Sequence, residues 1–441
     1  MRFGSFSPGL SAPTLHALRA DDIPMYFDMD NLTPKQAEDF AESNIIGAML
    51  QTCMMGISKP EDYIAVFAAV TQPPFDEVVK RYNTMMQKAG LSVVPLDHLI
   101  PTPVETFYEH VADNLPEVDV VDFMMVSPQN QILHGSSAAV DVIYKLNSKY
   151  HFAQNAPTFG IPVPESLAVT PPLANQGDIE GLFSRHKNQI MMKLDGMPGG
   201  RNVIPVSSVA EADNILTEVY PTATEVVLQQ RLNLLAFEEW TVDLLVTDDA
   251  ITVDNTRHIL LSEGNWVGNH IPPVSPLTSE QEALLINVGK YAQSFGFGTP
   301  EGSNLGIDYF IGKDGSIVVT EINPRWTAGL LPSEVLKRVG STGQHTIAYF
   351  DMIKQDDYEQ FFEYVEQRLP GARSGSFDVM PIGFSPYPID MEGTEMCYVW
   401  IVVRGDFVAY RDELQTQFGQ GSFPVATQIP VDELDLSGSD Q

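Results

Sequence analysis

Alternating apolar and polar positions predict strands along much of the chain. Residues 239–247, EWTVDLLVT, place Trp240, Val242 and Leu244 on one face, with polar side chains between them. A period of two is typical of a strand with one buried face. Apolar runs predict further strands at 118–126, 188–194, 225–230 and 396–403.

Segments with helical periodicity alternate with these strands. Residues 279–295 carry apolar side chains three to four positions apart, which predicts an amphipathic helix. Residues 76–89 predict another helix, which ends before Gly90. Two capping boxes, in which a serine and a glutamate satisfy free N–H groups, predict helix starts: Ser208 with Glu211, and Ser279 with Glu282. Together these elements predict a mixed fold of the α/β and α+β classes.

The length of the chain, 441 residues, suggests about three compact units. The first residues contain no apolar signal-peptide core, and the longest apolar run, 63–70, is too short to span a membrane. We therefore expect a cytoplasmic protein. The two cysteines, Cys53 and Cys397, are far apart in the sequence, which argues against a disulfide framework and against a cysteine zinc site.

The chain is strongly acidic. It has 25 Lys and Arg residues against 58 Asp and Glu residues, a net charge of −33. Nucleic acids and anionic membranes both require basic surface, so the charge argues against either as a large partner. An anionic ligand must be held by local cationic side chains, backbone N–H groups or a metal ion. Neither a Rossmann glycine motif after a strand nor a P-loop motif occurs in the sequence.

The most informative stretch is residues 306–325, GIDYFIGKDGSIVVTEINPR. It reads as two strands joined by Asp314-Gly315, a dipeptide that favours a tight type I′ hairpin. The pairs counted outward from that loop are Lys313 with Ser316, Phe310 with Val319, and Asp308 with Glu321. Asn323 lies two residues beyond Glu321 and shares its face. The predicted register thus assembles two carboxylates and an amide oxygen.

Two interpretations of this polar set are open. Like charges directly opposite each other destabilise a sheet, and a hard cation such as Mg²⁺, bound by one or two carboxylates and substrate phosphates, would relieve the repulsion. Alternatively, the face is exposed and its charges stay hydrated. Phe310, Ile317 and Val319 on the same face indicate partial burial, which disfavours unpaired carboxylates.

Together with KLDGMPGGRNV at 193–203 and EEWTVDLLV at 238–246, this hairpin resembles the ATP-grasp superfamily over about residues 145–350. Such enzymes are usually carboxylate–amine ligases, which phosphorylate a carboxylate with ATP before an amine attacks the acyl phosphate. The resemblance implies a pre-ATP-grasp α/β domain at 1–140, followed by a two-lobed ATP-grasp domain. Its lid subdomain would cover 141–225 and its catalytic subdomain 226–354, followed at 355–441 by a small β-containing extension with an acidic tail. Residues 134–149 resemble the domain junction in peptide ligases of the pheganomycin type.

The resemblance also implies ligand contacts. The cation, Mg²⁺ or Mn²⁺, would be bound by Asp308, Glu321 and Asn323. The ATP phosphates would be contacted by Lys149, Lys193, Gly196, Gly199, Gly200 and Arg201, in part through a glycine loop that folds over them. The adenine would be contacted by backbone groups of Gln229, Gln230, Arg231 and Leu232, and the ribose by Glu239, with Glu238 as the competing candidate. Lys149 could instead be a solvated helix residue.

Two cations are implied in catalysis. Lys193 and Arg325 match residues that offset negative charge on the transferred phosphoryl group and the acyl phosphate. A superfamily arginine that sometimes lies two residues before the first metal carboxylate is replaced here by Gly306, and Arg257 is a candidate substitute. The alternative is that Arg257 is an ordinary surface residue of its strand.

The function implied is that of a ligase that forms an amide or peptide bond and releases ADP and phosphate. Its substrates would be a small carboxylate and an amine, such as amino acids or peptides, with neither a nucleic acid nor a membrane as partner. An ATP-grasp kinase, a carboxylase and an ATP-binding module without turnover remain alternatives. The sequence identifies neither substrate, and it is compatible with a homo-oligomer.

Overall fold

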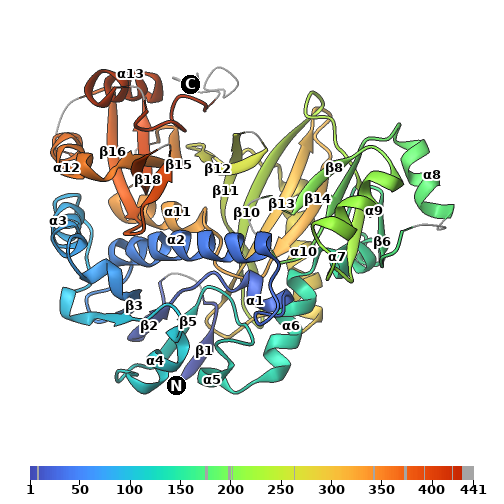
Figure 1. Ribbon diagram of the computed structural model, residues 1–441, viewed down its shortest axis with the longest axis horizontal. Coiled ribbons are helices and arrows are strands. Elements are labelled where there is room, and N and C mark those ends of the chain that lie inside the picture. Colours follow the sequence, from blue (N-terminus) through green and yellow to red (C-terminus); the bar gives the residue numbers. More distant parts are fainter. Residues whose placement is uncertain are drawn as a thin grey trace.

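The computed structural model describes residues 1–6, 9–173, 177–196, 200, 202–262, 264–340, 343–371, 375–391, 393–419 and 421–429. Gly199, Arg201 and the acidic tail at 431–441 lie outside the described residues. The described strands form three sheets, of five, four and nine strands. Figure 1 shows them as an N-terminal unit at the bottom, a small lobe on the right and a large sheet that extends from beside that lobe to the C-terminal strands at the upper left.

The N-terminal sheet is entirely parallel, in the order β1-β5-β2-β3-β4. Its central strands are almost entirely buried, as expected for a parallel sheet covered on both faces. They are β1 (Arg2–Gly4), β2 (Thr14–Ala17), β3 (Tyr63–Phe67), β4 (Leu99–Thr102) and β5 (Val120–Phe123). The accompanying helices are α1 (Asp22–Tyr26), α2 (Pro34–Ile57), α3 (Phe75–Lys88), α4 (Phe107–Asp113), α5 (Gln131–His134) and α6 (Ser137–Asn147).

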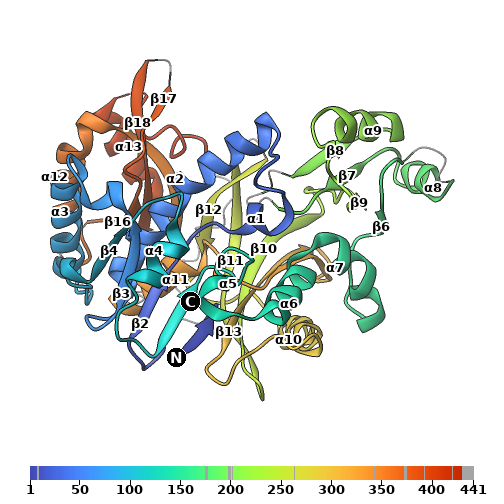
Figure 2. The same cartoon turned by 60° about the horizontal axis from the view of Figure 1, so that its bottom comes forward.

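The small lobe is an antiparallel sheet in the order β6-β9-β7-β8 with its own apolar core. It consists of β6 (Ser166–Val169), β7 (Ile190–Lys193), β8 (Val203–Val206) and β9 (Val226–Gln230), with α8 (Gly177–Arg185) and α9 (Val209–Glu218). Helix α7 (Lys149–Asn155) leads into it. In Figure 2 this lobe projects to the right of the rest of the molecule.

The large sheet is antiparallel, in the order β14-β13-β10-β11-β12-β15-β18-β16, with β17 also paired to β18. Its strands are β10 (Phe237–Val246), β11 (Ile251–Ser262), β12 (Asn265–Ile271), β13 (Ser303–Gly312), β14 (Ile317–Asn323), β15 (Thr346–Lys354), β16 (Phe377–Phe384), β17 (Ile389–Met391) and β18 (Thr394–Gly405). The helices of this part are α10 (Ser279–Ser294), α11 (Leu330–Val339), α12 (Tyr358–Glu366) and α13 (Phe407–Phe418). The sheet therefore continues across the predicted boundary at 354/355, and the division into domains stays a prediction.

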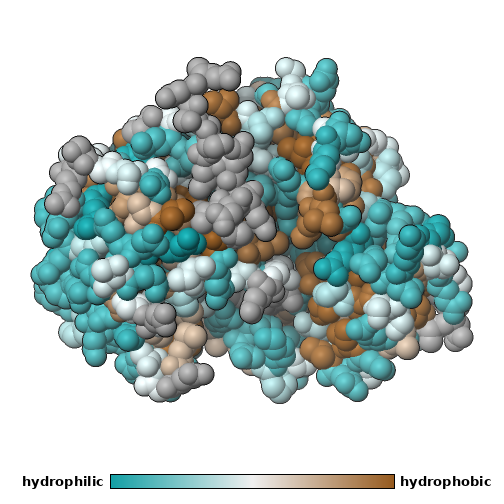
Figure 3. Space-filling model, turned by 90° about the horizontal axis from the view of Figure 1, so that it is seen from above, coloured by the Kyte–Doolittle hydropathy of each residue, from teal (hydrophilic) through white to brown (hydrophobic). Residues whose placement is uncertain are grey.

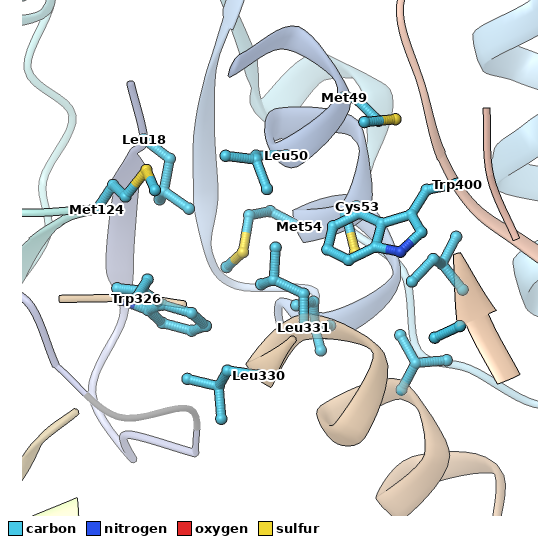
Figure 4. Close-up of a cluster of buried hydrophobic side chains, with 14 of the residues drawn as sticks. Leu18, Met49, Leu50, Cys53, Met54, Met124, Trp326, Leu330, Leu331 and Trp400 are labelled. Atoms are coloured by element: carbon cyan, nitrogen blue, oxygen red, sulfur yellow. The ribbon is translucent and has the colours of Figure 1, made fainter. Parts of the chain in front are cut away.

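A shared apolar core joins the N-terminal unit to the large sheet. In Figure 4, Leu330 and Leu331 of α11 face Leu50 and Met54 of α2, and Trp326 lies beside them. All five side chains are buried to at least 98%. This packing fixes the loop 324–329, between β14 and α11, against the N-terminal unit. Figure 3 shows a surface that is mostly hydrophilic, with smaller separate groups of apolar side chains.

The predicted helix at 76–89 is confirmed as α3, and the predicted start near Ser208 is confirmed by the bond from Glu211 N–H to Ser208 Oγ. The capping box at Ser279 is wrong by one residue, because extended Thr278 caps α10 and exchanges the two bonds with Gln281. Among the described helices, none combines the length and apolar character needed to cross a bilayer.

Candidate active site

The hairpin β13–β14 brings the two predicted carboxylates together. Asp308 pairs with Glu321, and Gly306 pairs with Asn323. The predicted pairing of Lys313 with Ser316 is wrong, because Gly312 N–H donates to the Ser316 carbonyl at 2.8 Å and leaves a three-residue loop. Gly315 in that loop has φ +83°, a backbone conformation that favours glycine.

A β-bulge corrects the register before it reaches the carboxylates. Val319 pairs with Tyr309 and not with Phe310 as predicted, and the next pair is Asp308 with Glu321. Thr320 is thus the extra residue of β14. The error at the turn and the bulge cancel, so the carboxylate pair was predicted correctly although the intervening pairs were not. Bulges commonly re-aim side chains next to functional sites.

The carboxylate pair is half-buried, and Asp308 is held in a bonded chain. Asn323 Nδ2 donates to Asp308 Oδ2 at 3.1 Å, and Arg325 Nη2 donates to Asn323 Oδ1 at 2.9 Å. Burial and the adjacent charge of Glu321 raise the pKa of Asp308. Burial alone would also raise the pKa of Glu321, but the ammonium groups of Lys149 and Lys193 outweigh it and lower that pKa.

The donor set suits a hard divalent cation. Two carboxylates and an amide oxygen match the oxygen ligands preferred by Mg²⁺ and Mn²⁺. Among the described residues, no group of three His, Cys, Asp or Glu side chains could hold a metal by itself. A cation here would therefore also need Asn323, whose oxygen already accepts from Arg325, and further oxygens from a substrate, and the predicted metal site stays a prediction.

Two lysines reach this pair from the side of the small lobe. Lys149 begins α7, and its Nζ lies 3.5 Å from Glu321 Oε2. Burial would lower the pKa of Lys149, but nearby carboxylates, Glu321 first, raise it. Lys193 ends β7, and its Nζ lies 3.5 Å from the Thr320 carbonyl oxygen. Burial lowers the pKa of Lys193, and Glu321 offsets this only in part. The alternative of a solvated Lys149 is wrong, since only 12% of its side chain is exposed.

Asp195, which the sequence reading did not single out, fixes the start of α7. Its Oδ2 accepts from Ser148 Oγ at 2.6 Å and its Oδ1 from Lys149 N–H at 2.7 Å. A carboxylate before a glycine usually signals only a turn, so the spacing gave no reason to link it to residue 149. In the structure, Asp195 links the start of the glycine loop to the backbone of Lys149.

The two described glycines of that loop lie against other parts of the chain. Gly196 has φ +94°, and a Cβ there would lie 2.7 Å from Cε2 of Phe27, just after α1. Gly200 has φ +83°, and a Cβ there would lie 3.3 Å from the Gly264 carbonyl oxygen. Only glycine satisfies both the conformation and the close approach at Gly196. The loop is therefore packed against the N-terminal unit on one side.

The geometry distinguishes the two candidate glutamates. Glu239 is on the face of β10 that carries Thr241, which pairs with Asp308. Burial, together with Glu321, raises the pKa of Glu239 to about 7 against the opposing charge of Lys193. Glu238 is exposed and points to the other face of the strand, toward His258. Glu239 thus faces the carboxylate pair, and its contact with a ribose stays a prediction.

The segment 229–232 links the small lobe to β10. Gln229 Nε2 donates to Ser166 Oγ at 3.0 Å. The N–H groups of Gln230 and Arg231 donate to the carbonyls of Glu165, at 2.8 Å, and Gln189, at 3.0 Å. These two donors are used within the lobe, so the predicted adenine contact would rest on carbonyl groups and on Leu232.

Arg325 lies where the large sheet meets the N-terminal unit. Its Nε is 3.3 Å from Asp22 Oδ1, and its carbonyl accepts from Asn304 Nδ2 at 2.8 Å. The next residue is tied to the N-terminal unit, because Trp326 N–H donates to the Met124 carbonyl at 2.9 Å. Arg325 is itself buried, so its position is set by both units.

The alternative of Arg257 as a surface arginine is wrong, because its side chain is only 1% exposed. Its Nη1 donates to Asp243 Oδ2 at 2.5 Å and also bonds Asn255. Asp243 pairs across the sheet with Gly306, the position at which the sequence resemblance leads one to look for an arginine. Asp243 neutralises the charge of Arg257 and also accepts from Asn304 and Thr327. The pair therefore braces the loop 324–329. Asp243 was missed, since polar positions alternate along any half-buried strand.

A scan against protein-family models and a search of curated proteins found no match. Solved structures do match, along almost the entire chain. N5-carboxyaminoimidazole synthetase from Staphylococcus aureus has a TM-score of 0.54 at 12% identity, covering 95% of this chain and 100% of that one. The chain has the ATP-grasp fold.

Two further structures agree with this fold. Biotin carboxylase from Campylobacter jejuni, in a β-γ-ATP complex, has a TM-score of 0.53 at 10% identity, covering 92% of this chain and 90% of that one. The ATP complex of carboxyaminoimidazole ribonucleotide synthase from Aspergillus clavatus has a TM-score of 0.52 at 12% identity, covering 87% and 97%. The predicted fold class is confirmed, and the match includes the regions before and after the ATP-grasp lobes. At such low identity the chemistry must be argued from the site.

Proposed function

We propose that this protein is an ATP- and Mg²⁺-dependent ligase. It converts a carboxylate into an acyl phosphate and joins it to an amine, releasing ADP and phosphate. The observation that supports this most is the convergence of a half-buried carboxylate pair, Asp308 and Glu321, with Lys149, Lys193 and Arg325. Anionic side chains for a cation and cationic side chains for phosphates then lie within one site, despite the acidity of the whole chain.

The residues of the chain act mainly by position and charge. Asp308, Glu321 and Asn323 would hold Mg²⁺, which offsets phosphate charge when bound. Lys193 and Lys149 contact phosphate oxygens, and Arg325 stabilises the acyl phosphate. Pre-arranged charges in a site that excludes water stabilise developing charge far better than they would in solution. Glu239, at the edge of the same face, orients the nucleotide.

The inventory of nucleophiles supports an acyl phosphate over an acyl-enzyme. Both Cys53 and Cys397 are buried in the apolar core, and burial raises the pKa of the Cys53 thiol and, together with Glu395, that of Cys397. A thiol in such surroundings is not activated for attack. The substrate is therefore activated by phosphorylation of one of its own carboxylate oxygens.

Carboxylation is the second candidate. Two of the similar structures are named as a carboxylase and a carboxyaminoimidazole synthetase. In that case bicarbonate takes the place of the organic acid, with the same cations and the same site. ADP release that requires bicarbonate, with a carbamate or carboxylated product, would favour it over amide formation.

A screen for stimulated ADP release tests the proposal. Amino acids and small carboxylates are supplied with ATP and Mg²⁺, and products are identified by mass spectrometry. Glu321→Gln should cut turnover and raise the Mg²⁺ requirement. Glu238→Gln, on the face of β10 opposite to Glu239, is the matched control and should retain activity. A phosphorylated substrate without condensation identifies a kinase, and a lack of ADP release identifies a binding module.

A further inference from the structure

Asp22 is a buried carboxylate at the junction between the N-terminal sheet and the large sheet. It is the first residue of α1, which follows the carboxyl end of β2. In open α/β sheets, ligands bind outside the carboxyl ends of parallel strands. The loop after β5 reaches the same place, because Asp21 Oδ2 accepts from Ser127 Oγ at 2.9 Å and from Asn130 Nδ2 at 3.1 Å. Asp21 thus ties the two loops together and fixes the backbone that carries Asp22.

Only one oxygen of Asp22 is used within the described part of the chain. Its Oδ1 accepts from Asn147 Nδ2 at 3.3 Å and lies 3.3 Å from Arg325 Nε. Its Oδ2 has no hydrogen-bond partner among the described residues, and it is buried, since only 4% of Asp22 is exposed. A buried carboxylate oxygen without a donor is costly. The charged and titratable groups around Asp22 are Arg325, Lys149, Asp21 and Tyr26.

The chemistry of amide formation supplies such a donor. An amine substrate arrives at neutral pH as an ammonium ion, which carries only donors and a positive charge. Asp308 and Glu321 are committed to the cation in the proposed function, and Asp21 Oδ2 already has three donors, from Tyr108, Ser127 and Asn130. Asp21 Oδ1 also lacks a hydrogen-bond partner among the described residues. Asp22, however, is the carboxylate that lies beside Arg325, the residue assigned to the acyl phosphate.

We propose that Asp22 binds the ammonium group of the amine substrate and accepts one of its protons. This inference rests on the proposed ligase function and names the residue that holds its second substrate. The proton moves from nitrogen to Asp22, and the nitrogen lone pair attacks the acyl carbon. The C–N bond forms as the C–O bond to phosphate breaks, and its electron pair leaves with the phosphate, which takes the second nitrogen proton. Asp22 then releases its proton to water.

A different role for Asp22 gives a different result. If its carboxylate served only to orient Arg325, its loss would impair the acyl phosphate itself, whichever nucleophile followed. Hydroxylamine separates the two roles, because it is uncharged at neutral pH and needs neither an ammonium site nor a base. It traps an acyl phosphate as a hydroxamate. The Asp22→Asn substitution keeps one oxygen as the acceptor for Asn147. It replaces the second oxygen with an amide NH2 group, so the charge and the free acceptor are lost together while the size of the side chain is kept.

The experiment uses the full chain with ATP, Mg²⁺ and the twenty standard amino acids as a mixed pool of acids and amines, with or without hydroxylamine. Peptide products are measured by mass spectrometry and hydroxamates by their colour with iron(III). In Asp22→Asn, peptide formation should fall about ten- to a hundredfold, the range for losing a charge-assisted hydrogen bond. Hydroxamate formation by the same variant should fall less than about threefold relative to wild type, since it does not need the Asp22 charge. Asp30→Asn removes the charge of an exposed carboxylate eight residues after Asp22; it is the control and should change neither product.

The pH profile adds a second readout. The deficit of Asp22→Asn in peptide formation should shrink as the pH rises toward the pKa of the amine, because more substrate then arrives uncharged. An equal fall in peptide and hydroxamate overturns the inference and leaves the ligase proposal standing, as does an unchanged peptide yield. If the wild-type protein forms neither product, the ligase proposal fails for amino acids, and the role of Asp22 fails with it.

Discussion

Trp326 Nε1 donates a hydrogen bond to Asp122 Oδ1 at 3.0 Å, and this bond anchors the loop that carries Arg325 to the N-terminal sheet. Asp122 is fully buried in β5 and also accepts from Phe6 N–H at 3.0 Å. Its second oxygen lies 3.0 Å from Nδ1 of His16 in β2. The position of Arg325 thus depends on a bonded network more than 200 residues away in sequence, which spacing could not reveal.

Loss of the indole donor should destabilise the protein and misplace Arg325. Trp326→Phe removes a hydrogen bond to a buried carboxylate, which is worth about 2 kcal/mol. The matched control is Trp240→Phe, which loses the same volume from a buried site but whose Nε1 has no partner among the described residues. We expect the unfolding free energy in urea to fall further for Trp326→Phe than for the control. Equal losses would contradict the role of the bond.

Stability should depend on the charge of His16. Burial alone lowers the pKa of His16, but the adjacent carboxylates of Asp122 and Asp62 outweigh it and raise that pKa to about 9 from 6.5. A histidine whose pKa is raised by folding stabilises the folded state, and this stabilisation is complete at pH values below the pKa of the unfolded protein. It is lost as the pH rises through the pKa of the folded protein. The unfolding free energy should therefore fall between pH 6.5 and about 9, by at most about 3 kcal/mol. His16→Gln should flatten this part of the curve, and a profile unchanged by the substitution would show that His16 is not its source.

The contact between Gly196 and Phe27 should matter for turnover. Gly196→Ala places a methyl group 2.7 Å from the Phe27 ring at a φ of +94°, so the glycine loop must shift. Gly160→Ala is the control, because Gly160 has φ +69° with nothing within 4 Å of a Cβ, and it reports the cost of conformation alone, about 1–2 kcal/mol. ADP release should fall more for Gly196→Ala, and Phe27→Ala in the same chain should restore part of it. No difference between the two alanine variants would remove the basis for this contact.

The buried pair of Asp243 and Arg257 should be far more sensitive than an exposed pair. Asp243→Asn leaves a guanidinium buried without its counter-charge, which costs about 3–5 kcal/mol. Glu165→Gln breaks the exposed pair with Arg185, whose side chains are 43% and 54% exposed, and should cost less than about 1 kcal/mol. Denaturant unfolding of both variants compares the two costs. A small effect of Asp243→Asn would mean that the pair does not brace the loop 324–329.

The sequence predicted the elements of the site better than their surroundings. The pairing of Asp308 with Glu321 was correct because a three-residue loop and a bulge at Thr320 compensate each other. Neither feature could be read from alternation, since Asp314-Gly315 favours a tight turn and Thr320 is an ordinary strand residue. Local patterns therefore predicted the carboxylate pair correctly but not the register of the residues between that pair and the turn.

The long-range contacts could not be predicted. Asp22, Asp122 and Asp195 each act on residues far away in the chain, and acidic residues are too common here for any one to stand out. The burial of Arg257 was missed for the same reason, because its partner Asp243 comes from a neighbouring strand. The joining of β15 to β18 in one sheet likewise depends on pairing between distant segments.

Oxygen from the carboxylate substrate reports most directly whether an acyl phosphate forms. Amino acids labelled with ¹⁸O in the carboxylate are incubated with the protein, ATP and Mg²⁺, and the phosphate and nucleotide products are analysed by mass spectrometry. In an acyl phosphate one carboxylate oxygen is bonded to phosphorus. When the amine attacks and the C–O bond breaks, that oxygen stays on the released phosphate. We expect one ¹⁸O in the released inorganic phosphate, with ADP unlabelled. Label in AMP, or unlabelled phosphate accompanying a condensed product, would contradict this expectation.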